Sequence, residues 1–181
     1  MKKNLPTTLL PNNQEVFCVQ PGEVKVLYEQ IQSYLKYGIT LNETSTVFDV
    51  GANIGLFSLL INNISKGKAK ICSFEPIPKI FQALKLNADK YNSHNIKTFP
   101  IGLGKQAQNI EFTYYPNATA ISSIYPYLSE KEKFIKILKD NVSDLPAPQN
   151  LIKYLPEPFL SLVSNILINF ALKAEKVECE I

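Results

Sequence analysis

Two glycines, Gly51 and Gly55, separate a short run of strand-forming residues from an apolar segment with helical spacing. The run Thr46–Val50 is β-branched and aromatic, and the apolar segment Leu56–Ile64 follows the second glycine directly. Glycine permits a sharp turn at the end of a strand and lets the next helix pack closely against its neighbours. The sequence therefore predicts a strand, a tight turn and a helix in immediate succession.

Two further strand patterns follow, with a helical pattern between them. Residues 69–74 and 96–101 are rich in strand-forming side chains, and residues 77–91 have helical spacing with Pro78 in the first turn. Strands that alternate with single helices over short connections form a parallel sheet. We therefore predict an α/β fold: a parallel sheet of three strands in the order 3-2-1, with helices on both faces.

The segments on either side of this core have other patterns. Residues 23–37 have helical spacing that Gly38 ends, and residues 110–115 alternate as a strand does, without a crossover helix before them. We expect residues 110–115 to pair antiparallel with a terminal strand, residues 177–181, as an extension beside the third strand. Residues 118–174 would then be a helical excursion that covers the mouth of the crevice.

Composition limits the size of the fold and the kinds of partner. The 181 residues are 45% hydrophobic and 19% charged, which suits one globular domain. All nineteen basic residues are lysine, so the guanidinium fork that recognises phosphate and guanine is absent. We expect no nucleic-acid partner, and we interpret the eight lysines of residues 64–105 as a solvated face.

The sequence offers no sign of a membrane or secreted protein. The longest apolar stretch, residues 159–172, is broken by polar side chains and is shorter than the roughly 20 residues that span a bilayer. The amino terminus lacks the apolar core of a signal peptide. Three cysteines fit neither a disulfide framework nor a zinc site. A cytoplasmic protein without a metal site is therefore expected.

Acidic side chains stand at the predicted carboxyl ends of the first two strands. Asp49, just before the Gly51 turn, suits an ammonium group or a water bound to one. Glu75 lies about twenty residues beyond Gly55, where an acid accepts both hydroxyls of a ribose. Amides at the start of the following helix would face the crevice and could meet a carboxylate. These features together predict half of a nucleoside-cofactor site.

Two common nucleotide-binding motifs are absent. A dinucleotide fingerprint, G-x-G-x-x-G, would need glycine where this chain has Asn53 and Leu56. A phosphate-binding loop would need G-K-S/T, which does not occur. A nucleotide-binding oxidoreductase half-domain is therefore the weakest of the interpretations considered.

The motif V-F-D-V-G-A-N-I-G (residues 47–55), followed by F-E-P (residues 74–76), resembles the FkbM-type family of class I S-adenosylmethionine-dependent methyltransferases. The similarity extends upstream to residues 34–39 and downstream to residues 112–117 with Ser122 and Ser123. The resemblance implies a Rossmann-like methyltransferase fold and S-adenosylmethionine as the cofactor.

The resemblance also implies residue roles. The turn Gly51-Ala52-Asn53 would cradle the methionyl part of the cofactor with Asp49 nearby, and Glu75 would hold the ribose. Pro76 and Ile77 would lie beside the adenine, with Gly102 and Leu103 on its other side. The candidate cofactor-binding residues are Asp49, Gly51, Ala52, Asn53, Gly55, Glu75, Pro76, Gly102, Leu103 and Tyr34.

No catalytic base is predicted. Methyl transfer from a sulfonium depends mainly on alignment of the reacting atoms. The one histidine, His94, precedes the third strand and so belongs at the end of the sheet opposite the crevice.

The family's activity suggests O-methylation of a small molecule, sugar, or polyketide or peptide natural product, in some members within a larger synthetase. The alternative is a catalytically inactive remnant or interaction module that keeps the cofactor-binding half-fold.

Family members continue into a fourth parallel strand with an L-K-I-D-x-E-G signature, which is absent here. We therefore expect a truncated fold or fragment, with an open edge on the first strand that favours self-association. The expected division is an N-terminal helical segment (1–45), an S-adenosylmethionine-binding core (46–117), and a lid-like helical excursion with a terminal strand (118–181).

Overall fold

A computed structural model describes residues 5–38, 40–91, 94–125, 166 and 169–181, and its centre is a three-stranded parallel sheet. The strands β3 (Thr46–Val50), β4 (Lys70–Phe74) and β5 (Ile96–Phe99) lie in the order β3-β4-β5. In this register Val47 pairs with Ile71, which pairs with Ile96. The predicted α/β class, the strand order and the parallel pairing are confirmed.

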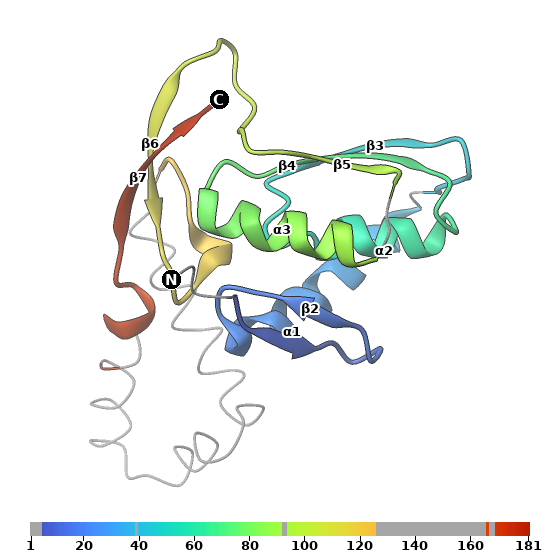
Figure 1. The fold of residues 1–181 in the computed structure, drawn as a ribbon, viewed down its shortest axis with the longest axis horizontal. Coiled ribbons are helices and arrows are strands. Elements are labelled where there is room, and N and C mark those ends of the chain that lie inside the picture. The colour runs from blue at the N-terminus through green and yellow to red at the C-terminus, as the bar shows by residue number, and fades with distance from the viewer. Residues whose placement is uncertain (1–4, 39, 92–93, 126–165, 167–168) are drawn as a thin grey trace, which may run out of the picture.

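The helices α2 (Leu56–Ile64) and α3 (Pro78–Lys90) both lie on one side of this sheet (Figure 1). Two right-handed crossovers that advance in the same direction place their helices on the same face. On the other face Phe48 and Val50 are 63% and 58% exposed. A helical layer on that second face, which the sequence analysis expects, does not occur among the described residues.

Proline residues set the start of α3 and the end of β5. The helix α3 starts at Pro78 because the residue before a proline, Ile77, is held extended. The strand β5 stops at Phe99 because Pro100 has no N–H to continue the ladder. These bounds differ from the predicted ones by one or two residues.

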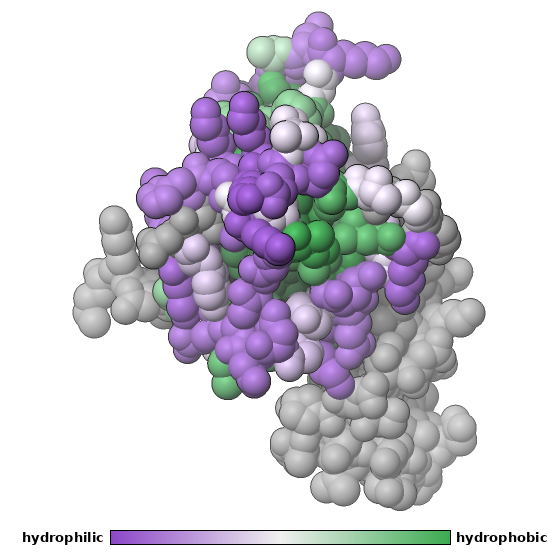
Figure 2. Space-filling model, turned by 90° about the vertical axis from the view of Figure 1, so that its right-hand side faces the viewer, coloured by the Kyte–Doolittle hydropathy of each residue, from purple (hydrophilic) through white to green (hydrophobic). Residues whose placement is uncertain are grey.

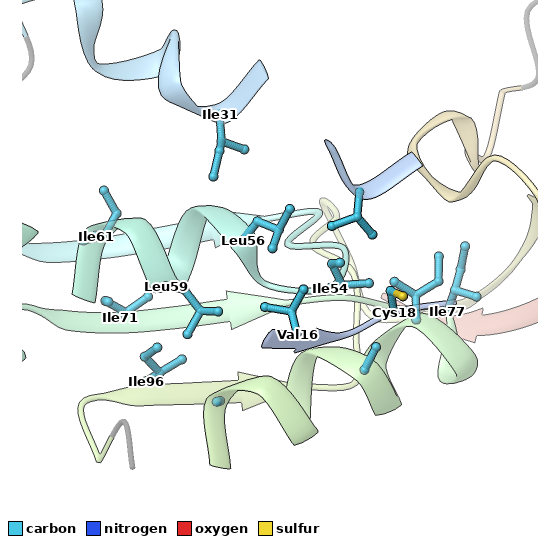
Figure 3. Packing of buried hydrophobic residues seen from close by; sticks show 14 of the residues in the cluster. Val16, Cys18, Ile31, Ile54, Leu56, Leu59, Ile61, Ile71, Ile77 and Ile96 are labelled. Carbon is cyan, nitrogen blue, oxygen red and sulfur yellow. The ribbon is translucent and has the colours of Figure 1, made fainter. Parts of the chain in front are cut away.

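The N-terminal segment contains a β-hairpin that the sequence analysis did not predict. Strands β1 (Thr7–Leu9) and β2 (Glu15–Phe17) pair antiparallel and precede α1 (Pro21–Gln32) and a 3-10 helix η1 (Tyr34–Tyr37), which Gly38 ends with φ 78°. Figure 3 shows Val16 of β2 in one cluster with Leu59 of α2 and Ile71 of β4. The hairpin is therefore part of the hydrophobic core.

The side chain of Asn87 joins this hairpin to α3 and to the turn after β3. Its Oδ1 accepts the Phe17 N–H at 2.7 Å, and its Nδ2 donates to the carbonyls of Phe17 at 2.9 Å and Ile54 at 2.8 Å. Asn87 is completely buried. A buried amide with its partners satisfied fixes three segments in one arrangement.

The terminal strand β7 (Glu175–Glu180) pairs antiparallel with β6 (Asn109–Tyr114), as predicted. The two strands form a sheet of their own, and the Gly102 N–H connects the segment after β5 to it through the Glu180 carbonyl at 2.9 Å. Most of the predicted helical excursion, residues 118–174, lies outside the described residues. A short 3-10 helix η2 (Thr119–Ile121) within it is described.

No helix in the described part of the chain is long and apolar enough to cross a bilayer.

We predict that Asn87→Ala lowers the free energy of unfolding by about 2–4 kcal/mol, because it leaves a buried N–H and two carbonyls without their partner. Urea denaturation of the purified chain measures this change. Asn63→Ala, on the exposed side of α2, is the matched control and should change stability by no more than about 0.5 kcal/mol. Equal stability of the two variants would contradict the role given to Asn87.

Candidate functional site

Two adjoining hollows lie at the carboxyl ends of β3 and β4. The first, the α1 hollow, is about 200 Å³ and lies between α1 and the turn after β3. The second, the Glu75 hollow, is about 320 Å³ and lies between that turn, the end of β4 and η2. Both are lined by Val50, Gly51, Asn53 and Ala120. Ligand sites of parallel α/β sheets form at this end of the strands.

The turn after β3 is held by its own backbone. The N–H groups of Gly51 and Ala52 donate to the Phe74 carbonyl at 3.0 and 2.9 Å, which ties the turn to the end of β4. Gly51 has φ 74°, where a residue with a Cβ would be strained. Gly55 has φ 87°, and a Cβ there would lie 2.6 Å from Leu84 Cδ1. Gly55 therefore lets α2 begin directly against α3.

The backbone N–H groups of this turn already donate hydrogen bonds to acceptors within the protein. Asn53 donates its N–H to Glu75, Ile54 to the Asn53 side chain at 2.8 Å, and Gly55 to the Ala52 carbonyl at 2.8 Å. The sequence analysis placed the amides that could meet a carboxylate at the start of the following helix, beyond this turn. Residues 51–55 therefore shape the turn and let the backbone approach a ligand closely. Any free N–H donors for that ligand would come from the first turn of α2.

Glu75 is the buried acid at the centre of the site. It is 4% exposed, its Oε2 accepts the Asn53 N–H at 3.0 Å, and its Oε1 accepts the Ile77 N–H at 2.9 Å. Burial raises the pKa of Glu75 to about 7; the two amide hydrogen bonds oppose this rise and the Asp49 charge adds to it. A carboxylate oxygen has a second lone pair, so each oxygen can still accept a hydrogen bond from a hydroxyl group.

Asp49 lies on the helix-covered side of β3 and lines the α1 hollow. Its Oδ2 accepts the Ser58 hydroxyl at 2.6 Å, and Ser58 lies 2.7 Å from the Ser73 hydroxyl. Burial raises the pKa of Asp49, and the hydrogen bonds from Ser58 lower it. The two serines, which the sequence analysis did not single out, orient this carboxylate from α2 and β4.

Nine of the ten predicted cofactor-binding residues line one of the two hollows, and Gly55 is the exception. Tyr34 lines the α1 hollow, and its ring packs 5.7 Å from that of Phe57. Pro76, Gly102 and Leu103 line the Glu75 hollow. The residues are thus brought together as expected, while their contact with a cofactor stays a prediction.

Two polar residues at the site were missed by the sequence analysis. The hydroxyl of Thr119, in η2, donates to Glu23 Oε1 at 2.7 Å and accepts from Asn53 Nδ2 at 3.0 Å. Burial raises the pKa of Glu23, and its hydrogen bonds to Thr119 and Ala120 lower it. No local pattern marks either residue, because the two are brought together only by the tertiary fold.

A larger hollow, of about 880 Å³, lies at the opposite end of the sheet and contains none of the motif residues. His94 lines it, as predicted, together with lysines such as Lys66 and Lys70. Lysines near the end of α2 complement the carbonyls of that helix terminus. Figure 2 shows this end of the molecule as mostly hydrophilic, which agrees with a solvated face.

Among the described residues, no group of His, Cys, Asp and Glu side chains is placed to hold a metal ion.

The chain is similar in sequence to several methyltransferases. It is 32% identical over 141 residues to 31-O-demethyl-FK506 methyltransferase FkbM of Streptomyces tacrolimicus, covering 76% of this chain and 54% of that protein. It is 30% identical over 132 residues to methyltransferase sdnD of Sordaria araneosa, covering 72% and 50% respectively. The chain thus spans about half the length of these curated relatives, and the predicted resemblance to FkbM-type sequences is confirmed.

Two further comparisons gave matches to a synthetase and to a solved structure. The AMB antimetabolite synthetase AmbE of Pseudomonas aeruginosa is 36% identical over 121 residues, which are 65% of this chain and 6% of the synthetase. The crystal structure of methyltransferase FkbM from Methylobacillus flagellatus KT matches 44% of this chain and 23% of its own, with 21% identity and a TM-score of 0.41. No family model matches the chain.

The raised pKa of Glu75 predicts a pH-dependent stability. The unfolded carboxyl ionises near its ordinary value of 4.5, whereas the folded one stays protonated until about pH 7. The stability that Glu75 contributes is therefore complete below pH 4.5 and is lost as the pH rises through 7. Between pH 4 and pH 8, the difference in free energy of unfolding between the wild-type chain and Glu75→Gln should fall by on the order of 3 kcal/mol.

Urea denaturation of the two proteins at each pH measures this difference. Glu23 titrates in both proteins, so its contribution cancels, whereas the interaction between Asp49 and Glu75 is part of the measured difference. A difference that does not change with pH would show that Glu75 is not a buried acid of this kind.

Proposed function

Because the chain is a sequence relative of the FkbM-type methyltransferases, we propose that it binds S-adenosylmethionine across the two hollows and serves in methyl transfer. The observation that carries this proposal is the hydrogen bond between Glu75 and the Asn53 amide. It places an acid suited to a ribose directly against the turn that would receive the methionyl group. The two halves of one cofactor would then occupy two hollows that share a wall.

The residues present suit each part of that cofactor. In the Glu75 hollow, the carboxylate would accept the ribose hydroxyls, and the adenine would lie between Pro76 and Leu103. In the α1 hollow, Asp49 would stand near the ammonium group of the methionyl part. The aromatic pair of Tyr34 and Phe57 forms part of the same hollow. Aromatic faces attract cations, so this wall suits a positively charged sulfonium.

The cofactor supplies an activated methyl group on a good leaving group, and the protein's part is alignment. We propose that the acceptor is a hydroxyl of a small molecule, such as a sugar or a polyketide or peptide product. The match to a region of the synthetase AmbE supports a second proposal, that such a chain can work within a larger assembly. The alternative of an inactive binding module keeps the same cofactor site without transfer.

At pH 8, where Glu75 is ionised, we expect Glu75→Ala to weaken binding of S-adenosylmethionine by about 2–4 kcal/mol, a factor of roughly 30 to 1,000, because two charge-assisted bonds to the ribose are lost. Isothermal titration calorimetry measures the change. Lys97→Ala, at the opposite end of the sheet, is the control and should leave the affinity within about twofold.

An unchanged affinity in a folded Glu75→Ala protein would refute the ribose assignment. Transfer of a labelled methyl group from S-adenosylmethionine to a panel of hydroxyl-bearing acceptors then distinguishes an active methyltransferase from an inactive binding module. Binding without transfer to any of them would favour the module that does not turn over.

A further inference from the structure

The segment that follows β6 forms a loop whose tip reaches back over the two hollows. Its base is closed by Thr113 and Ser123, whose backbones exchange hydrogen bonds of 2.9 and 3.1 Å. Inside the loop, the Ser122 hydroxyl accepts the Tyr115 N–H at 3.0 Å. We refer to residues 113–123 as the β6 loop. Its closed base restricts where η2, at the tip, can lie.

The tip of the β6 loop lies where the two hollows meet. Ala120 lines both of them, and Thr119 lines the Glu75 hollow. Thr119 is only 2% exposed. A shift of this tip would change the shape of both hollows at the point where a bound molecule must pass from one to the other.

The contacts that hold the tip of the β6 loop in the described part of the chain are polar rather than apolar. Glu23, in the first turn of α1, accepts the Thr119 hydroxyl at 2.7 Å, and the backbone amides of Thr119 and Ala120 lie close enough to lower the pKa of its carboxyl. A partly buried carboxylate without such partners would be costly, so this side chain favours one position of the loop. Apolar packing alone is less directional.

The same hydroxyl connects the loop to the motif turn. Thr119 accepts a hydrogen bond from Asn53 Nδ2, and the backbone N–H of Asn53 donates to Glu75. Asn53 has φ 50°, a conformation that asparagine tolerates and in which its side chain can bond locally. The chain of contacts Glu23–Thr119–Asn53–Glu75 therefore runs from α1 to the acid at the end of β4.

We propose that Glu23 and Thr119 are positioning residues, which fix the tip of the β6 loop across the two hollows and thereby set the affinity for the cofactor. This inference rests on the proposed function, because it assigns a purpose to the loop at that same site. Neither residue needs to touch the reacting atoms. Their effect is exerted through Ala120, which borders both hollows, and through Asn53.

Three substitutions test the proposal. Thr119→Val removes the hydroxyl at nearly constant volume, and Thr119→Ser restores it. Glu23→Gln keeps an acceptor for the hydroxyl but replaces one carboxylate oxygen, near the backbone amides of Thr119 and Ala120, with an amide donor. Thr46→Val makes the same chemical change as Thr119→Val at the opposite end of the sheet and serves as the control.

The first measurement is hydrogen–deuterium exchange in the full chain without ligand. Thr119→Val and Glu23→Gln should each speed exchange in residues 118–123 about tenfold, with Thr119→Ser and Thr46→Val close to wild type. Exchange in residues 78–90 should be unchanged in all four variants. A uniform increase over the whole chain would show general destabilisation and would overturn the proposed local role.

The second measurement is the dissociation constant of S-adenosylhomocysteine by calorimetry. We expect Thr119→Val to raise it about tenfold and Thr119→Ser to restore it to within about twofold of wild type. Wild-type affinity in Thr119→Val, with the β6 loop exchanging faster, would overturn the positioning role while the proposed function stands. Failure of the wild-type chain itself to bind S-adenosylhomocysteine would overturn the proposed function, and this inference with it.

Discussion

The hydrogen bond from the Asn53 amide to the Glu75 carboxylate is the contact on which the site depends. It joins the turn after β3 to the end of β4 at 3.0 Å, beside the two backbone bonds that the same turn makes to Phe74. It brings together the acid proposed to bind a ribose and the turn proposed to receive an amino-acid group. The arrangement leaves Glu75 buried, with a pKa raised to about 7 chiefly by that burial.

A buried acid such as Glu75 is tolerated because hydrogen-bond donors lie next to its oxygens. The Ile77 amide satisfies the second oxygen at 2.9 Å. Asp49, on the neighbouring strand, has its own partners in Ser58 and, through it, Ser73. Each carboxylate is thus held by donors from the element next to its own. Polar groups that are satisfied in this way keep one geometry, which a binding site requires.

Local sequence patterns predicted the parallel sheet, its strand order and the residues around the crevice. This was possible because alternating strand and helix patterns, together with Gly51 and Gly55, strongly limit the topology. The hairpin of β1 and β2 was not predicted, since its strands are three residues each and its contacts, such as that of Phe17 with Asn87, are to residues some seventy positions away in the chain. The pairing of Glu23 with Thr119 was missed for the same reason: hydrogen bonds between distant segments leave no periodic pattern.

Among the described residues β3 is an edge strand, where the sequence analysis expects self-association, and it borders the uncovered face of the sheet. The rings of Phe48, Phe74 and Phe99 stack along this face with centroid separations of 6.1 and 4.8 Å.

The proposed cofactor site is tested most directly by a calorimetric titration of the purified chain with S-adenosylhomocysteine and, separately, with NAD. We predict saturable binding of one S-adenosylhomocysteine per chain and no binding of NAD. Saturable binding of NAD, or no binding of S-adenosylhomocysteine, would contradict this prediction.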